Sequence, residues 1–520
     1  MKPSLQLVVT VTVVGIIALS LFSATAAAAA LSTTSSTSTL ASVTEMNALR
    51  DLHIATRGDD WTWYPNETAS GARWDFTKNA STGEYLYNPC GSDVNLQWQG
   101  ITCSALPTVV RLDLAQYNLT GTLPDSVGQL SSLTFLQFWD NKHLVGSIPS
   151  AIGDLHKLQL LDFDICALTG LLPATMSKLT ALEQFWASEN FFSGQIPLDF
   201  GDLSRLQFIN LFGNQFSGSL PSTLGKLRNM VLLGLDYNAM LTGTIPPELG
   251  QLTKMEILGI SNCGFSGTIP AELAKLQSVG YFYLQSNMLT GTISGDLGML
   301  VNSADFYLSN NALTGTIPPE LGGLVGVGDL YMDANMFTGT VPIDLFDQFH
   351  SLEVLRLQRN LLTGDLTGRF GGLLPMLQNV DFSDNRLSGS LPDDVFELPN
   401  LLNIALTLNC FEGTLPEALC SPRNVTVLSL DGLGAAKHCK NAVKVPLTGV
   451  TIFNTLGGTI PECVWNLPQL QVLHLTGNGK AQSHVCRSVH FIRNTFKLFC
   501  VLLCCVVDRS NRKHCGYSSR

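Results

Sequence analysis

A phrase of about 24 residues recurs along most of this chain, and no other feature restricts its fold as strongly. Its clearest copy runs from Ser303 to Leu324, and its general form is LxxLxLxxNxLxGxIPxxLGxLxx. Thirteen regular copies fill residues 109–424. Self-similarity at this period indicates a solenoid, because one repeat cannot bury its own leucines but a stack of repeats can.

The recurring positions within the phrase have distinct physical roles. The alternating leucines predict a short strand with one buried face and one face open to solvent. The asparagine that follows carries an amide that can satisfy backbone groups which no strand partner reaches. The glycine permits a turn conformation, and the proline fixes φ and removes a backbone donor. This asparagine occurs as Asn190, Asn214, Asn238, Asn287, Asn311, Asn335, Asn360 and Asn385.

The LxGxIPxxLGxL half of the phrase resembles the plant-type subclass of leucine-rich repeat, as in receptor ectodomains and secreted polygalacturonase inhibitors. With the irregular copies near the end, the resemblance covers residues 109–479. It implies an α/β solenoid, in which a right-handed superhelix carries a parallel β-sheet on its concave face.

The first 44 residues differ from the repeats. Met1-Lys2, an apolar run from Leu5 to Phe22 and the small residues after it predict a signal peptide over residues 1–30. The apolar run is also long enough for an uncleaved signal anchor. Residues 31–44 are rich in Ser and Thr and predict a flexible linker. Together these segments predict entry into the secretory pathway.

Residues 45–108 are expected to form an amino-terminal cap, which would cover the leucines of the first repeat. Apolar residues have helical spacing from Glu45 to Ala55, and the motif Trp98-Gln-Gly-Ile-Thr-Cys103 follows. This motif resembles the cap of plant-type repeat proteins, although the seven residues between Cys90 and the tryptophan exceed the usual spacing. The cysteines at 90 and 103 are predicted to form a disulfide.

The other eleven of the thirteen cysteines fall into three groups. Cys166 and Cys263 occupy the asparagine position of their repeats and are predicted to be buried free thiols. Five lie in the tail described next. The remaining four can form two bridges, whose connectivity the spacing leaves open, and they are Cys410, Cys420, Cys439 and Cys463.

The end of the chain departs from the repeat pattern. An irregular repeat with an insert occupies residues 425–469, and residues 480–520 form a tail with eight Lys or Arg and one acidic residue. The tail holds an apolar segment, 498–507, which is shorter than the about 20 residues of a membrane-spanning helix. Three interpretations remain open: a terminus without a folded role, a weak membrane anchor, or a cysteine-rich cap.

Composition and motifs exclude several classes of function. The formal net charge of −11 argues against binding to nucleic acid or to anionic membranes in general. The sequence contains no zinc-binding spacing, phosphate loop, nucleophile elbow or kinase motif set, so we expect no metal or cofactor. Four acceptor sequences for N-glycosylation begin at Asn66, Asn79, Asn118 and Asn424.

Aromatic and charged residues gather at strand positions that are expected to face solvent on the concave side. Three of them, Tyr283, Tyr307 and Tyr331, lie between the strand leucines of successive repeats, and parallel strands about 4.8 Å apart would align their rings as a ladder. Such a ladder either only stabilises the sheet or offers exposed rings and interleaved acids to a ligand. The candidate ligand-binding residues are Tyr281, Tyr283, Asp305, Tyr307, Asp329, Tyr331, Asp333, Trp186, Phe208, Phe212, Tyr237, Arg356 and Arg359.

A catalytic interpretation is weighed against recognition. Asp305 and Asp329 on adjacent strands can stand about 5 Å apart, as in a retaining glycosidase. An open, solvated arc neither raises one carboxyl pKa nor excludes water, so we expect no enzymatic activity. We expect a non-catalytic extracellular recognition protein that binds a peptide, protein or glycan, works with a membrane co-receptor and has no kinase domain of its own. The alternative is a soluble secreted inhibitor or wall-associated binding protein.

Overall fold

The computed structural model describes residues 41–63, 71–90, 97–105, 107–370, 374–421, 424–430, 456–457, 464, 467–474 and 490–492. They belong to one compact unit, Ala41–Arg520. The predicted signal peptide, linker residues 31–40, Asn66, Cys439, Cys463, segment 498–507 and most of the irregular repeat lie outside the described residues.

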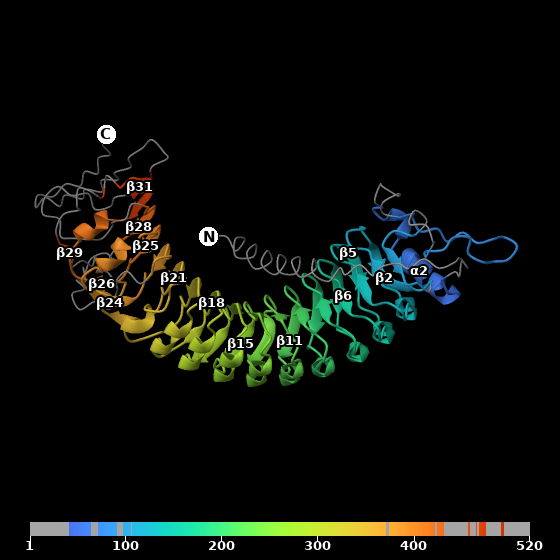
Figure 1. The fold of residues 1–520 in the computed structure, drawn as a ribbon, viewed down its shortest axis with the longest axis horizontal. Helices are drawn as coiled ribbons and strands as arrows, with labels where there is room; N and C mark the ends of the chain where they lie inside the picture. Colours follow the sequence, from blue (N-terminus) through green and yellow to red (C-terminus); the bar gives the residue numbers. More distant parts are fainter. Residues whose placement is uncertain are drawn as a thin grey trace, which may run out of the picture. The chain divides into compact units, whose positions relative to one another are not determined.

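The strand leucines of successive repeats build one long sheet on the inner side of the curved stack (Figure 1). Neighbouring repeats pair in parallel and in register, so that Phe282 lies beside Phe306 and Phe306 lies beside Leu330. Within the described residues this sheet consists of β1 (Ile101–Cys103), β2 (Val109–Asp113), β4 (Phe135–Gln137), β6 (Leu160–Asp162), β8 (Gln184–Trp186), β10 (Phe208–Asn210), β12 (Leu232–Gly234), β14 (Ile257–Gly259), β16 (Tyr281–Tyr283), β18 (Asp305–Tyr307), β20 (Asp329–Tyr331), β21 (Val354–Arg356), β23 (Asn379–Asp381), β25 (Asn403–Ala405), β28 (Val427–Ser429), β30 (Val472–His474) and β31 (His490–Ile492). The predicted solenoid with a parallel sheet on its concave face is confirmed.

Two antiparallel strands close the ends of this sheet. In the cap, β1 pairs with β2, and at the other end β31 pairs with β30. An end strand covers the backbone donors and acceptors that the last parallel strand would otherwise leave unpaired. Residues 490–492, which the sequence pattern assigned to an atypical tail, therefore extend the sheet.

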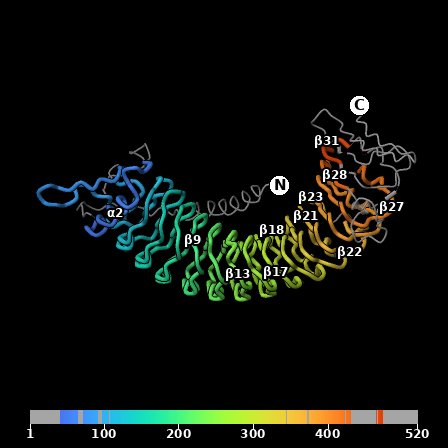
Figure 2. The backbone as a smooth tube through the Cα atoms, turned by 180° about the vertical axis from the view of Figure 1, so that it is seen from behind, coloured from blue at the N-terminus to red at the C-terminus, as the bar shows by residue number. Residues whose placement is uncertain are grey.

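The second half of each repeat forms a further strand and a 3-10 turn on the outer side of the stack (Figure 2). The further strands are β3 (Thr120–Thr122), β5 (His143–Gly146), β7 (Ala167–Gly170), β9 (Phe191–Gly194), β11 (Gln215–Ser219), β13 (Met240–Thr244), β15 (Gly264–Gly267), β17 (Met288–Gly291), β19 (Ala312–Leu313), β22 (Thr363–Gly364), β24 (Arg386–Gly389), β26 (Cys410–Phe411), β27 (Gly413–Thr414) and β29 (Leu456–Gly457). The 3-10 turns are η2 (Asp125–Gln129), η3 (Ser150–Asp154), η4 (Ala174–Lys178), η5 (Leu198–Asp202), η6 (Ser222–Lys226), η7 (Pro247–Gln251), η8 (Ala271–Lys275), η9 (Gly295–Met299), η10 (Pro319–Gly323), η11 (Ile343–Leu345), η12 (Asp394–Glu397) and η13 (Glu417–Cys420). Most of these turns follow the proline of the phrase, which cannot donate to a strand partner.

The recurring asparagine joins each repeat to the one before it, as predicted. The Asn238 side chain is buried, and its Nδ2 donates to Leu211 O at 3.0 Å and to Leu235 O at 2.8 Å. Its Oδ1 accepts from Phe216 N at 3.0 Å. One amide thus satisfies backbone groups that no strand pairs. The same pattern recurs at Asn214 and Asn385.

Two repeats carry cysteine in place of this asparagine, and both thiols are free. Cys166 Sγ lies 3.3 Å from Phe138 O, and Cys263 Sγ lies 3.4 Å from Leu235 O. Burial raises the pKa of each thiol to about 12. Cys166 is buried as predicted, but Cys263 is only half-buried because the next residue is Gly264, which has no side chain to cover it. Near the end of the array, Cys410 and Cys420 are each disulfide-bonded.

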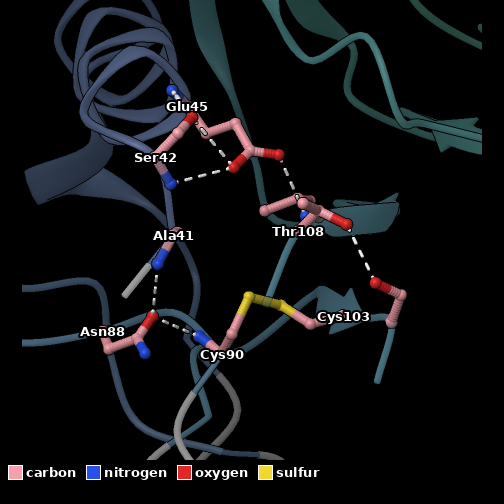
Figure 3. Close-up of a disulfide and its surroundings, with 9 residues drawn as sticks. Ala41, Ser42, Glu45, Asn88, Cys90, Cys103 and Thr108 are labelled. Carbon is pink, nitrogen blue, oxygen red and sulfur yellow. Dashed lines mark hydrogen bonds between the residues drawn. A yellow bond between two sulfur atoms is a disulfide. The ribbon is translucent and has the colours of Figure 1, made fainter. Parts of the chain in front are cut away.

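The cap is tied to the first repeat through helix α2 (Val43–Ala55), which is followed by the 3-10 turn η1 (Gly58–Asp60). The helix begins two residues before the predicted Glu45, because Ser42 caps it. Glu45 is buried, and its Oε2 accepts from Ser42 N and Oγ while its Oε1 accepts from Val109 N in β2 (Figure 3). Nearby, Cys90 and Cys103 are disulfide-bonded, with their Cα atoms 5.5 Å apart (Figure 3).

Within the described part of the chain, no helix combines the length and apolar character needed to cross a membrane.

Candidate ligand-binding surface

The concave face of the sheet is identified by the alternation of its side chains. Phe282, Phe306 and Leu330 are buried in the core between the two sides of the stack. Because successive strand residues point to opposite faces, the residues on either side of each core residue face the concave side. The concave face therefore carries Tyr281 and Tyr283 in β16, and the matching residues of the other strands.

Three successive strands place tyrosines side by side on this face. Tyr283 pairs in register with Tyr307, and Tyr307 pairs with Tyr331. Their ring centroids lie 5.0 Å and 4.2 Å apart, and the second pair is stacked with an interplanar angle of 4°. The guanidinium of Arg356 on the next strand lies 4.4 Å from the centre of the Tyr331 ring. The predicted ladder is thus present and ends in a cation–π contact.

The two aspartates beside the ladder are part of its hydrogen bonding. The Tyr283 hydroxyl donates to Asp305 at 2.6 Å, and the Tyr307 hydroxyl donates to Asp329 at 2.9 Å. Burial raises the pKa of Asp305, although the Tyr283 hydrogen bond acts in the opposite direction. Each carboxylate therefore has a tyrosine of the preceding strand as its partner, an arrangement that supports the ladder rather than general acid–base chemistry.

The expectation that these aromatic side chains are exposed is wrong for several of them. Tyr283 and Tyr307 retain 3% and 8% of their surface, because rings on neighbouring strands cover each other's faces. The same pairing buries Trp186 against Phe208, whose ring centroids lie 5.9 Å apart. The remaining candidates divide into one buried residue, Phe212, five half-buried residues, Tyr237, Tyr281, Asp305, Asp329 and Tyr331, a further half-buried acid, Asp333, and two exposed residues, Arg356 and Arg359.

The structure brings the candidates together in two groups rather than one. Phe212 contacts Tyr237 with ring centroids 5.1 Å apart, near the Trp186–Phe208 pair. Between this group and the tyrosine ladder, β12 and β14 carry glycine at the ladder position, Gly234 and Gly259. These two strands therefore interrupt the aromatic surface.

Sequence reasoning missed Asp236, which lies beside this interruption. Its carboxylate is only 3% exposed, and its Oδ1 accepts from Ser261 N at 2.7 Å. A Cβ at Gly259 would overlap with the carboxylate, so the glycine provides the space that the aspartate occupies. Burial raises the pKa of Asp236 to about 6. Comparing the residue after each core leucine across repeats would have drawn attention to this position.

We expect protonation of Asp236 to stabilise the fold. Its pKa rises from 3.8 to about 6, so the folded state binds the proton more tightly than the unfolded chain. Its contribution to the free energy of unfolding should therefore fall by about 3 kcal/mol as pH rises from 4 to 7. The test compares urea unfolding of the wild type and Asp236→Asn across this range. A difference between the two proteins that does not change with pH would contradict this assignment.

The other predicted surface features have the following positions. Asn118 and Asn424 are exposed, and Asn118 has a left-handed backbone with φ of 57°. Asn79 is half-buried, and its Oδ1 accepts from Ser81 N at 2.8 Å. Within the described residues, no group of three His, Cys, Asp or Glu side chains is arranged to hold a metal ion.

Comparison with known proteins places these observations in a family. The family model described as Leucine Rich Repeat matches residues 205–227, 254–276, 305–324 and 376–398. No curated protein sequence matches the chain.

Three solved structures illustrate the similarity. The plant peptide hormone receptor RGFR1 in complex with RGF2 is 31% identical, covering 69% of this chain and 54% of that one, with a TM-score of 0.62. The PEPR1–AtPEP1 structure is 25% identical, covering 83% and 55%, with a TM-score of 0.69. The Arabidopsis receptor kinase HAESA, in complex with the peptide hormone IDA and the co-receptor SERK1, is 27% identical, covering 84% and 70%, with a TM-score of 0.63.

This chain spans just over half the length of the first two of these structures. The repeat matches, the stacked parallel sheet and these similarities lead to one conclusion: the chain is a leucine-rich-repeat protein that resembles the ectodomains of plant receptors.

Proposed function

We propose that this protein is a non-catalytic, extracellular recognition protein that binds a peptide on its concave face. The observation that carries the proposal is an apolar strip that the fold does not use as core. Its members are buried but lie apart from the core cluster, and they are Leu160, Trp186, Phe208, Phe212, Leu232, Ile257, Tyr283 and Tyr307.

The strip suits recognition because its side chains are already packed. Paired rings and hydrogen-bonded hydroxyls, such as that of Tyr307, hold it in one conformation. A ligand laid along a preorganised surface loses less affinity to the ordering of side chains. Half-buried Tyr281 and Tyr331 and exposed Arg356 border the strip and offer polar contacts. The similarity to RGFR1 and HAESA, whose structures contain peptide hormones, favours a peptide over a glycan.

The same similarity supports a receptor-like role at the cell surface, in which a membrane co-receptor takes part. HAESA is seen together with the co-receptor SERK1. This role needs a chain that enters the secretory pathway, which the predicted signal peptide and glycosylation sites would provide. The proposal for location is tested by following a carboxyl-terminal tag through culture medium, alkaline-extractable membrane and alkaline-resistant membrane, with the amino terminus sequenced in parallel.

The binding proposal is tested by replacing the tyrosine ladder. Peptides selected by the wild-type protein from a randomised library should bind the Tyr283→Ala, Tyr307→Ala, Tyr331→Ala triple variant at least about thirtyfold more weakly, because buried aromatic residues dominate binding energy. Affinity would be measured by calorimetry on secreted protein.

A matched control replaces three exposed side chains away from the concave face, Met299→Ala, Val301→Ala and Val325→Ala. This variant should retain the wild-type affinity. Equal affinity of the tyrosine variant and the wild type would reject the concave face as the binding site.

A further inference from the structure

The concave face carries far more acidic than basic side chains. We count, for the thirteen regular repeats, the two strand residues that face this side and the two residues that follow the next core residue. These positions hold eleven acids and three bases. The acids are Asp113, Asp140, Asp162, Asp164, Glu189, Asp236, Asp305, Asp329, Asp333, Asp381 and Asp384, and the bases are Arg111, Arg356 and Arg359.

The few bases leave most of these acids without a cation. Arg111 is bound to Asp113 at 2.8 Å, and Arg356 lies over the Tyr331 ring. In the described part of the chain, Asp162, Asp164 and Asp236 have no lysine or arginine within ion-pair distance. Burial raises the pKa of Asp162 to about 7 and that of Asp236 to about 6, which is the response of a buried carboxylate without a cation.

A second observation comes from the residue after each core leucine, a row that we name the acceptor row. It contains Asp236, Ser261, Gln285, Ser309, Asp333 and Gln358 in successive repeats. Gln285 is 5% exposed, and its Oε1 has no hydrogen-bond partner among the described residues. Gln358 Oε1 is likewise buried and unpartnered among them.

The unsatisfied atoms of the acceptor row thus share one chemistry. An amide oxygen and a carboxylate both accept hydrogen bonds, and a buried acceptor without a donor is destabilising. A ligand that donates hydrogen bonds and carries positive charge would satisfy both needs. Lysine and arginine side chains do this, and their aliphatic stems and cationic ends also suit the tyrosine rings beside the row.

We propose that the ligand is a basic peptide, whose lysine or arginine side chains donate to the acceptor row between Asp236 and Gln358. This inference rests on the proposed peptide-binding function and adds the charge of the ligand and the residues that select it. The apolar strip binds the rest of the peptide.

The test uses the full-length secreted protein and a phage library of randomised 12-residue peptides. Peptides enriched by the wild type should be rich in lysine and arginine, and their affinity should fall as salt is raised. Asp236→Asn removes one charge without changing the shape of the side chain, and we expect it to weaken binding by about tenfold. Gln285→Leu removes the unpartnered acceptor and should weaken binding as well.

The matched control is Asp202→Asn, an exposed acid of η5 on the outer side that pairs with Lys226. It should leave affinity unchanged. A scrambled peptide of the same charge should bind about tenfold more weakly than the selected one, because general attraction to an acidic surface does not depend on residue order.

The outcomes separate this inference from the proposed function. Enriched peptides without a basic bias, or equal loss in Asp236→Asn and Asp202→Asn, would overturn the acceptor row while leaving peptide binding intact. Equal binding of the scrambled peptide would also overturn it. Failure of the wild type to enrich any peptide would overturn both proposals. Because Asp236→Asn is expected to stabilise the fold at neutral pH, weaker binding by this variant cannot be ascribed to unfolding.

Discussion

Asn238→Ala is expected to unfold the centre of the repeat stack and to prevent accumulation of the secreted protein. The substitution removes the three hydrogen bonds to Leu211, Leu235 and Phe216 described above. It leaves buried backbone groups unpaired, at about 1–3 kcal/mol for each. The total, about 3–6 kcal/mol, is comparable to the stability of many whole domains.

The loss should spread beyond one repeat, because each repeat is stabilised mainly by its neighbours. Secreted yield and urea unfolding monitored by circular dichroism would measure it. The control is Asn302→Ala, which removes a single exposed hydrogen bond to Gln277 O. Asn238→Cys should have an intermediate effect, because Cys263 shows that a thiol at this position approaches one carbonyl oxygen. Wild-type stability of Asn238→Ala would show that the amide is dispensable.

Glu45→Ala is expected to separate the cap from the first repeat. The side chain caps helix α2 through Ser42 and accepts from Val109 N, which belongs to a buried residue of β2. Removing it forfeits the helix cap and leaves a buried donor unpaired, so we expect a loss of about 2–4 kcal/mol. The leucines of the first repeat would then become accessible to solvent.

Hydrogen exchange at Val109 and limited proteolysis of residues 45–108 would detect this separation. Glu45→Gln should have a smaller effect, because its amide oxygen retains one of the two acceptor positions. Glu272→Ala, on the outer turn η8, is the control and should leave exchange unchanged. Unaltered exchange at Val109 in Glu45→Ala would show that other contacts hold the cap.

The acidic concave face and the tyrosine ladder have opposite implications for the apo protein. The ladder is internally satisfied, since the hydroxyls of Tyr283 and Tyr307 each have an aspartate partner. The acceptor row is not, since Gln285 Oε1 has no partner among the described residues. The ladder therefore contributes to stability without ligand, whereas the row keeps hydrogen-bonding capacity for a ligand.

The sequence by itself determined the features that depend on position within a repeat. A period of about 24 residues predicted the solenoid, the strand leucines predicted the parallel sheet, and the asparagine predicted the hydrogen bonds seen at Asn238. The alignment of Tyr283, Tyr307 and Tyr331 followed from the same counting. These features are local, because each repeat presents the same pattern to a neighbour of the same shape.

Only the tertiary structure decided what covers each side chain. Burial of the Tyr307 ring depends on residues 24 positions away on either side, and the environment of Asp236 depends on the absence of a side chain at Gly259. The antiparallel strand β31 likewise could not be seen in a pattern that had already ended. Exposure and hydrogen bonding are set by contacts between repeats, and these contacts change wherever one repeat replaces a large side chain with a small one.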